Sequence, residues 1–215
     1  GISFTECRNV LVEGITIMNS PSWTVNPVRC DIVTIRGLII QNPPDSPNTD
    51  GINPDSCRSV HISDCHVSVG DDCITLKSGT EAEPPELRSA CSDVVITNCT
   101  LEHGHGGVVI GSEMSGGVRN VVISNCVFNK TDRGIRLKSR RGRGGVIEDV
   151  RVSNVIMKDV LCPFTMNMYY GCGAWGDPAV SDKGPRPVDA GTPAVRSVHL
   201  CGVTAKGVKL AAAFL

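Results

Sequence analysis

The stretch Val94-Val95-Ile96-Thr97-Asn98-Cys99-Thr100-Leu101 contains the pattern that decides the fold. Apolar residues alternate with other residues on both sides of Asn98, and the same arrangement returns six more times along the chain. A fixed set of residue types at fixed offsets, recurring roughly every 30 residues apart from a longer last interval, is typical of a solenoid protein. The other copies begin at Val10, Val33, Val60, Val121, Val150 and Val198.

Each copy alternates with a period of two, which indicates β-strands and not helices. The central position of every copy holds Gly, Asn or Asp, which are the residues that best tolerate the positive φ of a tight bend. These central residues are Gly14, Gly37, Asp64, Asn98, Asn125, Asn154 and Gly202. The sequence therefore predicts an all-β fold, a right-handed parallel β-helix built from a single chain, with one domain over residues 1–215.

The composition agrees with a single domain and argues against nucleic acids and membranes as partners. The chain has 215 residues, 40% of them hydrophobic, which is enough to bury a core. A net charge of −1 gives no indication of nucleic-acid binding. No apolar run approaches the ~18 residues of a membrane span, so we expect no membrane partner, and we expect a monomer.

The ends of the chain resemble cuts through a longer solenoid. The repeat is already present at the first residues, and Ala211–Leu215 reads as part of a strand. Because solenoids need caps on their terminal coils, we expect N-terminal coils or a cap, and the C-terminal end, to be missing. Residues 171–194 are rich in Gly, Pro and Asp, and we interpret them as a long loop at one rim of a cleft or as a disordered excursion.

The eleven cysteines are an odd number, so they cannot all form disulfides within the chain. Cys65, Cys99 and Cys126 occupy the same inward offset on successive coils, which favours a row of small, reduced core residues. Reduced cysteines favour the cytoplasm, and secretion stays open because the N-terminus is expected to be incomplete.

A second strand can be aligned through Ile52, Ile74, Val108 and Ile135, and this alignment brings acidic residues together. Asp50 and Asp72 both lie two residues before such an anchor, while Asp71 and His105 lie three residues before one. Residues at equal offsets lie one strand spacing apart, about 4.8 Å. Asp50 should therefore lie against Asp72, and Asp71 beside His105.

Two cations belong to the same face. Arg136 and Lys138 alternate with the inward Leu137, so both should point outward. Fixed cations beside an acidic cluster suit a substrate that carries carboxylates.

Four short strings carry a family resemblance: Asn48-Thr49-Asp50-Gly51, Gly70-Asp71-Asp72-Cys73, Gly104-His105-Gly106-Gly107 and Arg136-Leu137-Lys138. In this order on the coils of a β-helix, they resemble the polygalacturonases of glycoside hydrolase family 28, which have the pectin-lyase-like solenoid fold. The string Ile110–Gly117 is similar to bacterial, often exo-acting, members. The resemblance covers essentially the whole chain and corresponds to the central, catalytic part of the family domain.

The resemblance implies hydrolysis of α-1,4 bonds in polygalacturonate or pectin, by inversion and without metal or cofactor. It implies that Asp71 is the general acid and that Asp50 and Asp72 activate water, with His105 in a supporting role. The resemblance further implies that Arg136 and Lys138 bind the galacturonate carboxylate. For the remaining substrate contacts it implies Asn48 and one tyrosine, either Tyr169 or Tyr170.

The residues alone leave several alternatives open. Cleavage of a glycosidic bond needs one acid and one base or nucleophile, and neighbouring carboxylates raise each other's pKa. Carboxylates this close could also be spaced as in a retaining enzyme. A rhamnogalacturonan or xylogalacturonan hydrolase, a calcium-dependent pectate lyase and a non-catalytic carbohydrate-binding β-helix are the other interpretations.

Overall fold

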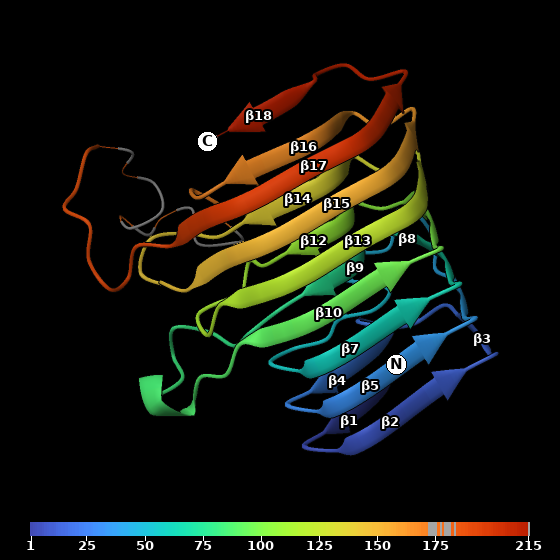
Figure 1. Ribbon diagram of the computed structural model, residues 1–215, viewed down its shortest axis with the longest axis horizontal. Coiled ribbons are helices and arrows are strands. Elements are labelled where there is room, and N and C mark those ends of the chain that lie inside the picture. Colours follow the sequence, from blue (N-terminus) through green and yellow to red (C-terminus); the bar gives the residue numbers. More distant parts are fainter. Residues whose placement is uncertain (172–175, 177, 179–181, 183, 215) are drawn as a thin grey trace.

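The computed structural model describes residues 1–171, 176, 178, 182 and 184–214, and it is a right-handed parallel β-helix (Figure 1). The predicted fold class is confirmed, since every strand pair is parallel and each strand lies beside the equivalent strand of the next coil. The part of the chain that the structure describes contains no helix long and apolar enough to cross a membrane.

One face of the solenoid is formed by the repeated pattern. Its strands lie side by side across the front of Figure 1. They are β2 (Arg8–Glu13), β5 (Asp31–Arg36), β7 (Arg58–Ser63), β10 (Cys91–Thr97), β13 (Val118–Asn129), β15 (Val146–Lys158) and β17 (Ala194–Lys206). The same sheet continues around a bend into β3 (Thr16–Met18), β6 (Ile39–Gln41), β8 (His66–Val69) and β11 (Thr100–His103).

The opposite face carries the second strand of each coil. These strands are β1 (Ile2–Thr5), β4 (Val25–Val28), β9 (Asp72–Leu76), β12 (Gly106–Ile110), β14 (Arg133–Lys138), β16 (Cys162–Asn167) and β18 (Ala212–Phe214). Short bridges from Ile52 to Val25 and to Ile74 join the first two strands to the rest. The anchors Ile74, Val108 and Ile135 are direct register partners, as predicted.

The bends between strands are fixed by left-handed backbone positions. All seven central residues of the repeat have a positive φ, between 53° and 64°, which confirms the prediction. A second row of positive φ values lies at the residue before each copy and was not predicted. It includes Ile32, with φ 58°, a conformation that is costly for a β-branched residue. The remaining members are Asn9, Ser59, Asp93, Asn120, Asp149 and Ser197.

The core is a set of stacked columns of small and branched side chains. Val33, Val60, Val94, Val121 and Val150 follow one another and are all fully buried. The predicted cysteine column is also buried, and the ten cysteines among the described residues are free thiols. Burial raises the pKa of the Cys57 thiol to about 12, so this thiol stays neutral.

The loops between the two faces differ in length and shape one edge of the molecule. The connection from β9 to β10 contains a short 3-10 turn, η1 (Pro85–Leu87), which projects at the lower left of Figure 1. The predicted insertion at residues 171–194 lies between β16 and β17, and nine of its positions (172–175, 177, 179–181 and 183) are outside the described residues. Its described part contacts Arg141 and Gly142.

Neighbouring residues of β13 give a test of the core. Ile123 is fully buried, whereas the next residue back, Val122, is 40% exposed on the other side of the strand. We expect Ile123→Ala to lower the free energy of unfolding by about 2–5 kcal/mol, because it leaves a cavity in the column. Val122→Ala is the matched control, with an expected loss below about 1 kcal/mol. Equal losses in urea unfolding would contradict the assigned register.

Candidate active site

The three predicted carboxylates converge where the second strand of two coils begins. Asp72 is the first residue of β9, and the pairing of Ile52 with Ile74 places Asp50 on the neighbouring coil beside it. The chain must come very close at this point, because a side chain on Gly51 would lie 2.5 Å from the carbonyl oxygen of Cys73. Oxygen atoms of Asp50, Asp71 and Asp72 all lie within 4.8 Å of one another.

Asp72 is held by the two predicted cations from two coils away. The Nζ atom of Lys138 donates to Oδ2 of Asp72 at 2.7 Å, and Nη1 of Arg136 donates to Oδ1 at 3.3 Å. On the intervening coil the register partner of Asp72 is Gly106, and a Cβ atom there would lie 3.3 Å from Oδ1 of Asp72 and 3.5 Å from Cδ of Arg136. The missing side chain at Gly106 thus leaves room for both cations to reach across.

Asp71 and His105 form the predicted pair, with Nδ1 of His105 3.1 Å from Oδ1 of Asp71. This contact raises the pKa of His105. For Asp71 burial acts to raise the pKa, but the hydrogen bond and charge of His105 outweigh it and the pKa is lowered. In the unliganded site, His105 therefore binds a proton more readily than Asp71 does.

Asp50 is the carboxylate whose protonation is favoured. It is only 3% exposed, and its Oδ2 accepts hydrogen bonds from Nδ2 of Asn53 at 2.8 Å and from Oγ1 of Thr75 at 3.4 Å. Burial, followed by the negative charge of Asp72, raises the pKa of Asp50 to about 6. The sequence analysis expected neighbouring carboxylates to raise each other's pKa; this holds for Asp50, whereas the pKa of Asp71 is lowered.

A group of three carboxylates is also a geometry that could hold a cation. Here each carboxylate already has a protein donor: Lys138 and Arg136 on Asp72, His105 on Asp71, and Asn53 on Asp50. The two cations supply the positive charge that a metal ion would otherwise provide.

The structure distinguishes the two candidate tyrosines. The Tyr170 ring covers both cations, with its centroid 5.2 Å from Cζ of Arg136 and 4.8 Å from Nζ of Lys138. Tyr169 lies instead against Arg141, 5.4 Å from its Cζ. Tyr170 is therefore the one of the two tyrosines whose ring contacts Arg136 and Lys138. Asn48 is exposed, with φ 56°, close in sequence to the buried Asp50.

A second charged group is centred on Lys77, whose positive charge acts to lower the pKa of Asp50. The Lys77 ammonium is buried and lies 4.6 Å from the centre of the Trp23 ring. It donates to Oε2 of Glu113 at 2.6 Å, and Glu113 also pairs with Arg143 at 3.4 Å. Burial acts to raise the pKa of Glu113, but Lys77 outweighs it and lowers the pKa to about 2.

Trp23 was missed by the sequence analysis, although a signal was available. It lies two residues before Val25, which pairs with Ile52, so Trp23 occupies the same offset as Asp50 and Asp72. On the opposite side of the acids, a cavity of about 320 Å³ is lined by Arg133, Arg136 and Asn167 among others. The site is therefore bounded by an aromatic ring on one side and, on the other, by a cavity whose lining combines two arginines with apolar residues such as Leu161, Leu210 and Ala213.

Comparison with known proteins identifies the family. The family model of the glycosyl hydrolases family 28 matches residues 1–179. The chain belongs to this family.

The relatives of the family 28 chain are longer than it is. A polygalacturonase of Nicotiana tabacum is 33% identical over 173 residues, which are 79% of this chain and 41% of the relative. An exopolygalacturonase from Thermotoga maritima has a TM-score of 0.79 and 35% identity over 97% of this chain and 43% of that one. An exopolygalacturonase from Yersinia enterocolitica has a TM-score of 0.78 and 27% identity, over 94% of this chain and 34% of that one. The chain spans 34% to 41% of the length of the curated relatives that head the comparison.

The raised pKa of Asp50 makes the stability of the family 28 chain depend on pH. The folded-state pKa of Asp50, about 6, exceeds the ordinary 3.8. The contribution of Asp50 to the free energy of unfolding is therefore fully present below pH 3.8 and is lost as the pH rises through 6. We expect Asp50→Asn to raise the free energy of unfolding at pH 7.5 by about 1–3 kcal/mol, with no gain at pH 4.

Asp71→Asn provides a control of opposite sign. In the parent protein the pKa of the Asp71 carboxyl is lowered. The contribution of Asp71 to the free energy of unfolding is therefore present above the ordinary pKa and is lost as the pH falls through the folded-state value. Urea unfolding at both pH values should show Asp71→Asn to be less stable than the parent at pH 7.5. An Asp50→Asn variant that is no more stable than the parent at pH 7.5 would show that burial of this charge is not costly.

Proposed function

We propose that this protein hydrolyses α-1,4 bonds between galacturonate units of pectic polymers. The observation that carries the proposal is the contact of Arg136 and Lys138 with Asp72 inside a group of three carboxylates. Carboxylates supply the acid and base that glycoside hydrolysis requires, and the cations suit a sugar that is itself a carboxylate. The polygalacturonase names of the family 28 relatives support the same substrate.

Asp71 donates the proton to the leaving oxygen in this proposal. In the free protein the proton is held on the His105 side of the Asp71–His105 pair. A sugar bound over the pair excludes water, and loss of water disfavours an ion pair relative to a neutral acid and a neutral imidazole. Substrate binding thus shifts the proton from Nδ1 of His105 to Oδ1 of Asp71, which makes Asp71 a general acid.

Asp50 and Asp72 act on the attacking water. Asp50 accepts the proton, since its pKa is raised to about 6, while Asp72 is held in ion pairs with Arg136 and Lys138. Asp72 orients the water through an oxygen that its cations hold in place. Asn53 and Thr75 fix the second oxygen of Asp50 by hydrogen bonds.

The substrate carboxylate is bound by donors that Asp72 leaves free. Lys138 has three N–H donors and Arg136 has five, and each uses one of them on Asp72. The Tyr170 ring covers their other side and limits where a carboxylate can approach. The cavity beside Arg136 gives the sugar ring a place next to these donors.

Asp71→Asn tests the proposed acid. We expect the release of reducing ends from polygalacturonate, with a chelator present, to fall by about 10²- to 10⁴-fold, because the proton donor is removed. Asp45→Asn is the control, since Asp45 is an exposed carboxylate outside the cluster and should retain full activity. Circular dichroism establishes that each variant is folded. Unchanged activity in Asp71→Asn would refute the assignment, and unsaturated products that depend on calcium would identify a lyase.

The stereochemistry is decided in the same assay by proton NMR of the first product. Inversion rests on the family resemblance, because carboxyl groups closer than about 5.5 Å are typical of retaining enzymes and those of inverting enzymes lie about 6.5–9.5 Å apart. We expect the β-anomer to be formed first from the α-linked polymer. The α-anomer as first product would show that one carboxylate acts as a nucleophile.

Tyr170 and Tyr169 form a matched pair for the substrate site. Tyr170→Leu should raise KM for oligogalacturonates about three- to tenfold, because the ring that positions both cations is removed. Tyr169→Leu should change KM less than about twofold, since its ring contacts Arg141 and not the two cations. An equal rise in both variants would mean that the loop as a whole, and not Tyr170, shapes the site.

A further inference from the structure

A row of charged side chains runs along the edge of the sheet at the start of its strands. The residues are direct register partners from one coil to the next. In order they are Arg8, Asp31, Arg58, Ser92, Arg119, Glu148 and Arg196. Their charges alternate strictly in sign, except that Ser92 stands where the alternation requires an acid.

The acids of this row already have partners. Asp31 pairs with Arg8 at 3.4 Å and with Arg58 at 3.0 Å, and Glu148 pairs with Arg196 at 2.7 Å. Arg119, in contrast, forms no ion pair or hydrogen bond through its side chain with any residue that the structure describes. The cation next to the missing acid is thus the one that is left without an anion.

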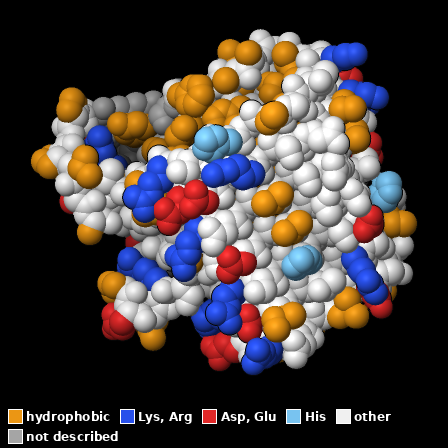
Figure 2. Space-filling view, in the orientation of Figure 1, with side chains coloured by type: hydrophobic (Ala, Val, Ile, Leu, Met, Phe, Trp, Pro, Cys, Tyr) orange, Lys and Arg blue, Asp and Glu red, His pale blue; other side chains and the backbone are white. Residues whose placement is uncertain are grey.

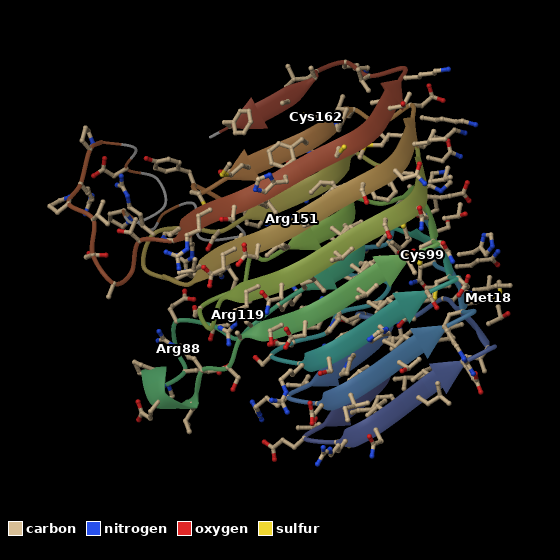
Figure 3. The ribbon with its side chains drawn as sticks, viewed as in Figure 1. Met18, Arg88, Cys99, Arg119, Arg151 and Cys162 are labelled. Atoms are coloured by element: carbon tan, nitrogen blue, oxygen red, sulfur yellow. The ribbon has the colours of Figure 1, made fainter. Side chains whose placement is uncertain are left out.

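An open pocket of about 550 Å³ lies at this position, lined among others by Arg29, Arg58, Arg88, Ser89, Ser92 and Arg119. Figure 3 shows Arg88 and Arg119 projecting from neighbouring segments on the same side of the sheet, and Figure 2 shows basic side chains gathered along this edge. One acid, Asp31, lines the pocket, and a second, Asp93, is the chain neighbour of Ser92. Asp31 is paired within the row, and Asp93 accepts hydrogen bonds from Ser92 and Asn120. Arg29 pairs with Glu6 at 3.0 Å.

The wall of the pocket is held in place by backbone contacts. Arg88 donates to the carbonyl oxygens of Glu81 and Glu83, both at 2.9 Å, through Nη2 and Nε. The loop also comes very close to Gly116, where a Cβ atom would lie 2.3 Å from the carbonyl oxygen of Ser89. The pocket therefore exists before any ligand binds.

The same loop connects the pocket to the network beside the catalytic acids. Glu81 pairs with Arg143 at 3.1 Å on the side where Arg143 contacts Glu113. Arg88 faces the pocket on the other side of the loop. The loop between β9 and β10 therefore contacts both the charged network of Glu113 and the pocket.

We propose that this basic pocket is a second binding site for a carboxylate of the pectic polymer, with the sugar's carboxylate in the place of the missing acid of the row. The choice of ligand rests on the proposed function. An anionic oxygen group between Arg58 and Arg119 completes the alternation, and charge-assisted hydrogen bonds to guanidinium groups are its natural contacts. The pocket has a volume in the range of small-ligand sites.

The test follows backbone amide NMR signals of Ser89, Ser92 and Gly116 while trigalacturonate or sulfate is added to the Asp71→Asn protein, which should not cleave the probe. We expect saturable shifts with trigalacturonate, with a Kd on the order of 1 mM. Arg119→Gln and Ser92→Asp should each weaken binding about fivefold or more, since one removes a donor and the other supplies the missing acid. Arg151→Gln is the matched control: it makes the same change in net charge on β15, outside the pocket, and should bind as the parent does.

Each other outcome counts against the proposal. The absence of saturable shifts with either probe would refute the pocket as a site. Equal weakening in Arg151→Gln would show an effect of overall charge only. Binding of sulfate without trigalacturonate would refute the polymer as the ligand. The NMR measurement detects binding and does not depend on hydrolysis. It can therefore show binding at the pocket in a protein that does not hydrolyse polygalacturonate, or no binding at the pocket in one that does.

A kinetic measurement links the pocket to the reaction. With otherwise unmodified protein, Arg119→Gln should raise KM for long polygalacturonate about three- to fivefold and leave KM for trigalacturonate and kcat unchanged. One short oligomer does not span the acidic cluster and the pocket, so its binding to the pocket does not add to its binding at the cluster, whereas one polymer chain can occupy both sites. An equal change for both substrates would contradict a second site.

Discussion

Everything in this molecule depends on the register between coils. Backbone hydrogen bonds join each strand to its equivalent in the next coil, so residues at equal offsets lie one strand spacing apart. A slip of one residue would turn the valine columns outward and the acids inward, because the side-chain period of a strand is two. Bends with positive φ at the same offset in every coil prevent such a slip. The register therefore both builds the core and assembles the acidic cluster.

The rigid register holds the carboxylates of the acidic cluster in buried positions, where a negative charge lowers the stability of the fold. Asp50 and Asp72 are almost fully buried, and a buried carboxylate without compensation is strongly disfavoured. Asp72 is compensated from two coils away by Lys138 and Arg136, a reach that the absent side chain of Gly106 permits. Asp50 is not compensated to the same degree, and its raised pKa is the result. The scaffold thus tolerates a local loss of stability at Asp50, which suits the proton-accepting role that we propose for this group.

The sequence was informative wherever periodicity determines position. Asp50 against Asp72, and Asp71 beside His105, follow from offsets alone, and the fold class follows from the repeat. Periodicity ends where β16 ends at Asn167, so it could not choose between Tyr169 and Tyr170. There the choice depends on a loop contact, in which the amide of Tyr170 donates to the carbonyl oxygen of Ser139. The identity of the carboxylate with the raised pKa depends on depth of burial, which offsets do not give.

A residue that departs from the type found at the same offset in other coils can indicate a difference in function at that position. Trp23 occupies an acidic offset on a neighbouring coil, and its ring packs on the buried Lys77. Ser92 occupies an acidic offset in the edge row, and there no side chain of the described residues takes the place of the acid beside Arg119. These two exceptions have different consequences for the cation beside them. Lys77 has Glu113 as a partner, while Arg119 remains exposed beside an open pocket. In a solenoid, a cation that lacks its anion in an otherwise alternating row is the position where an anion from outside the chain gains most by binding.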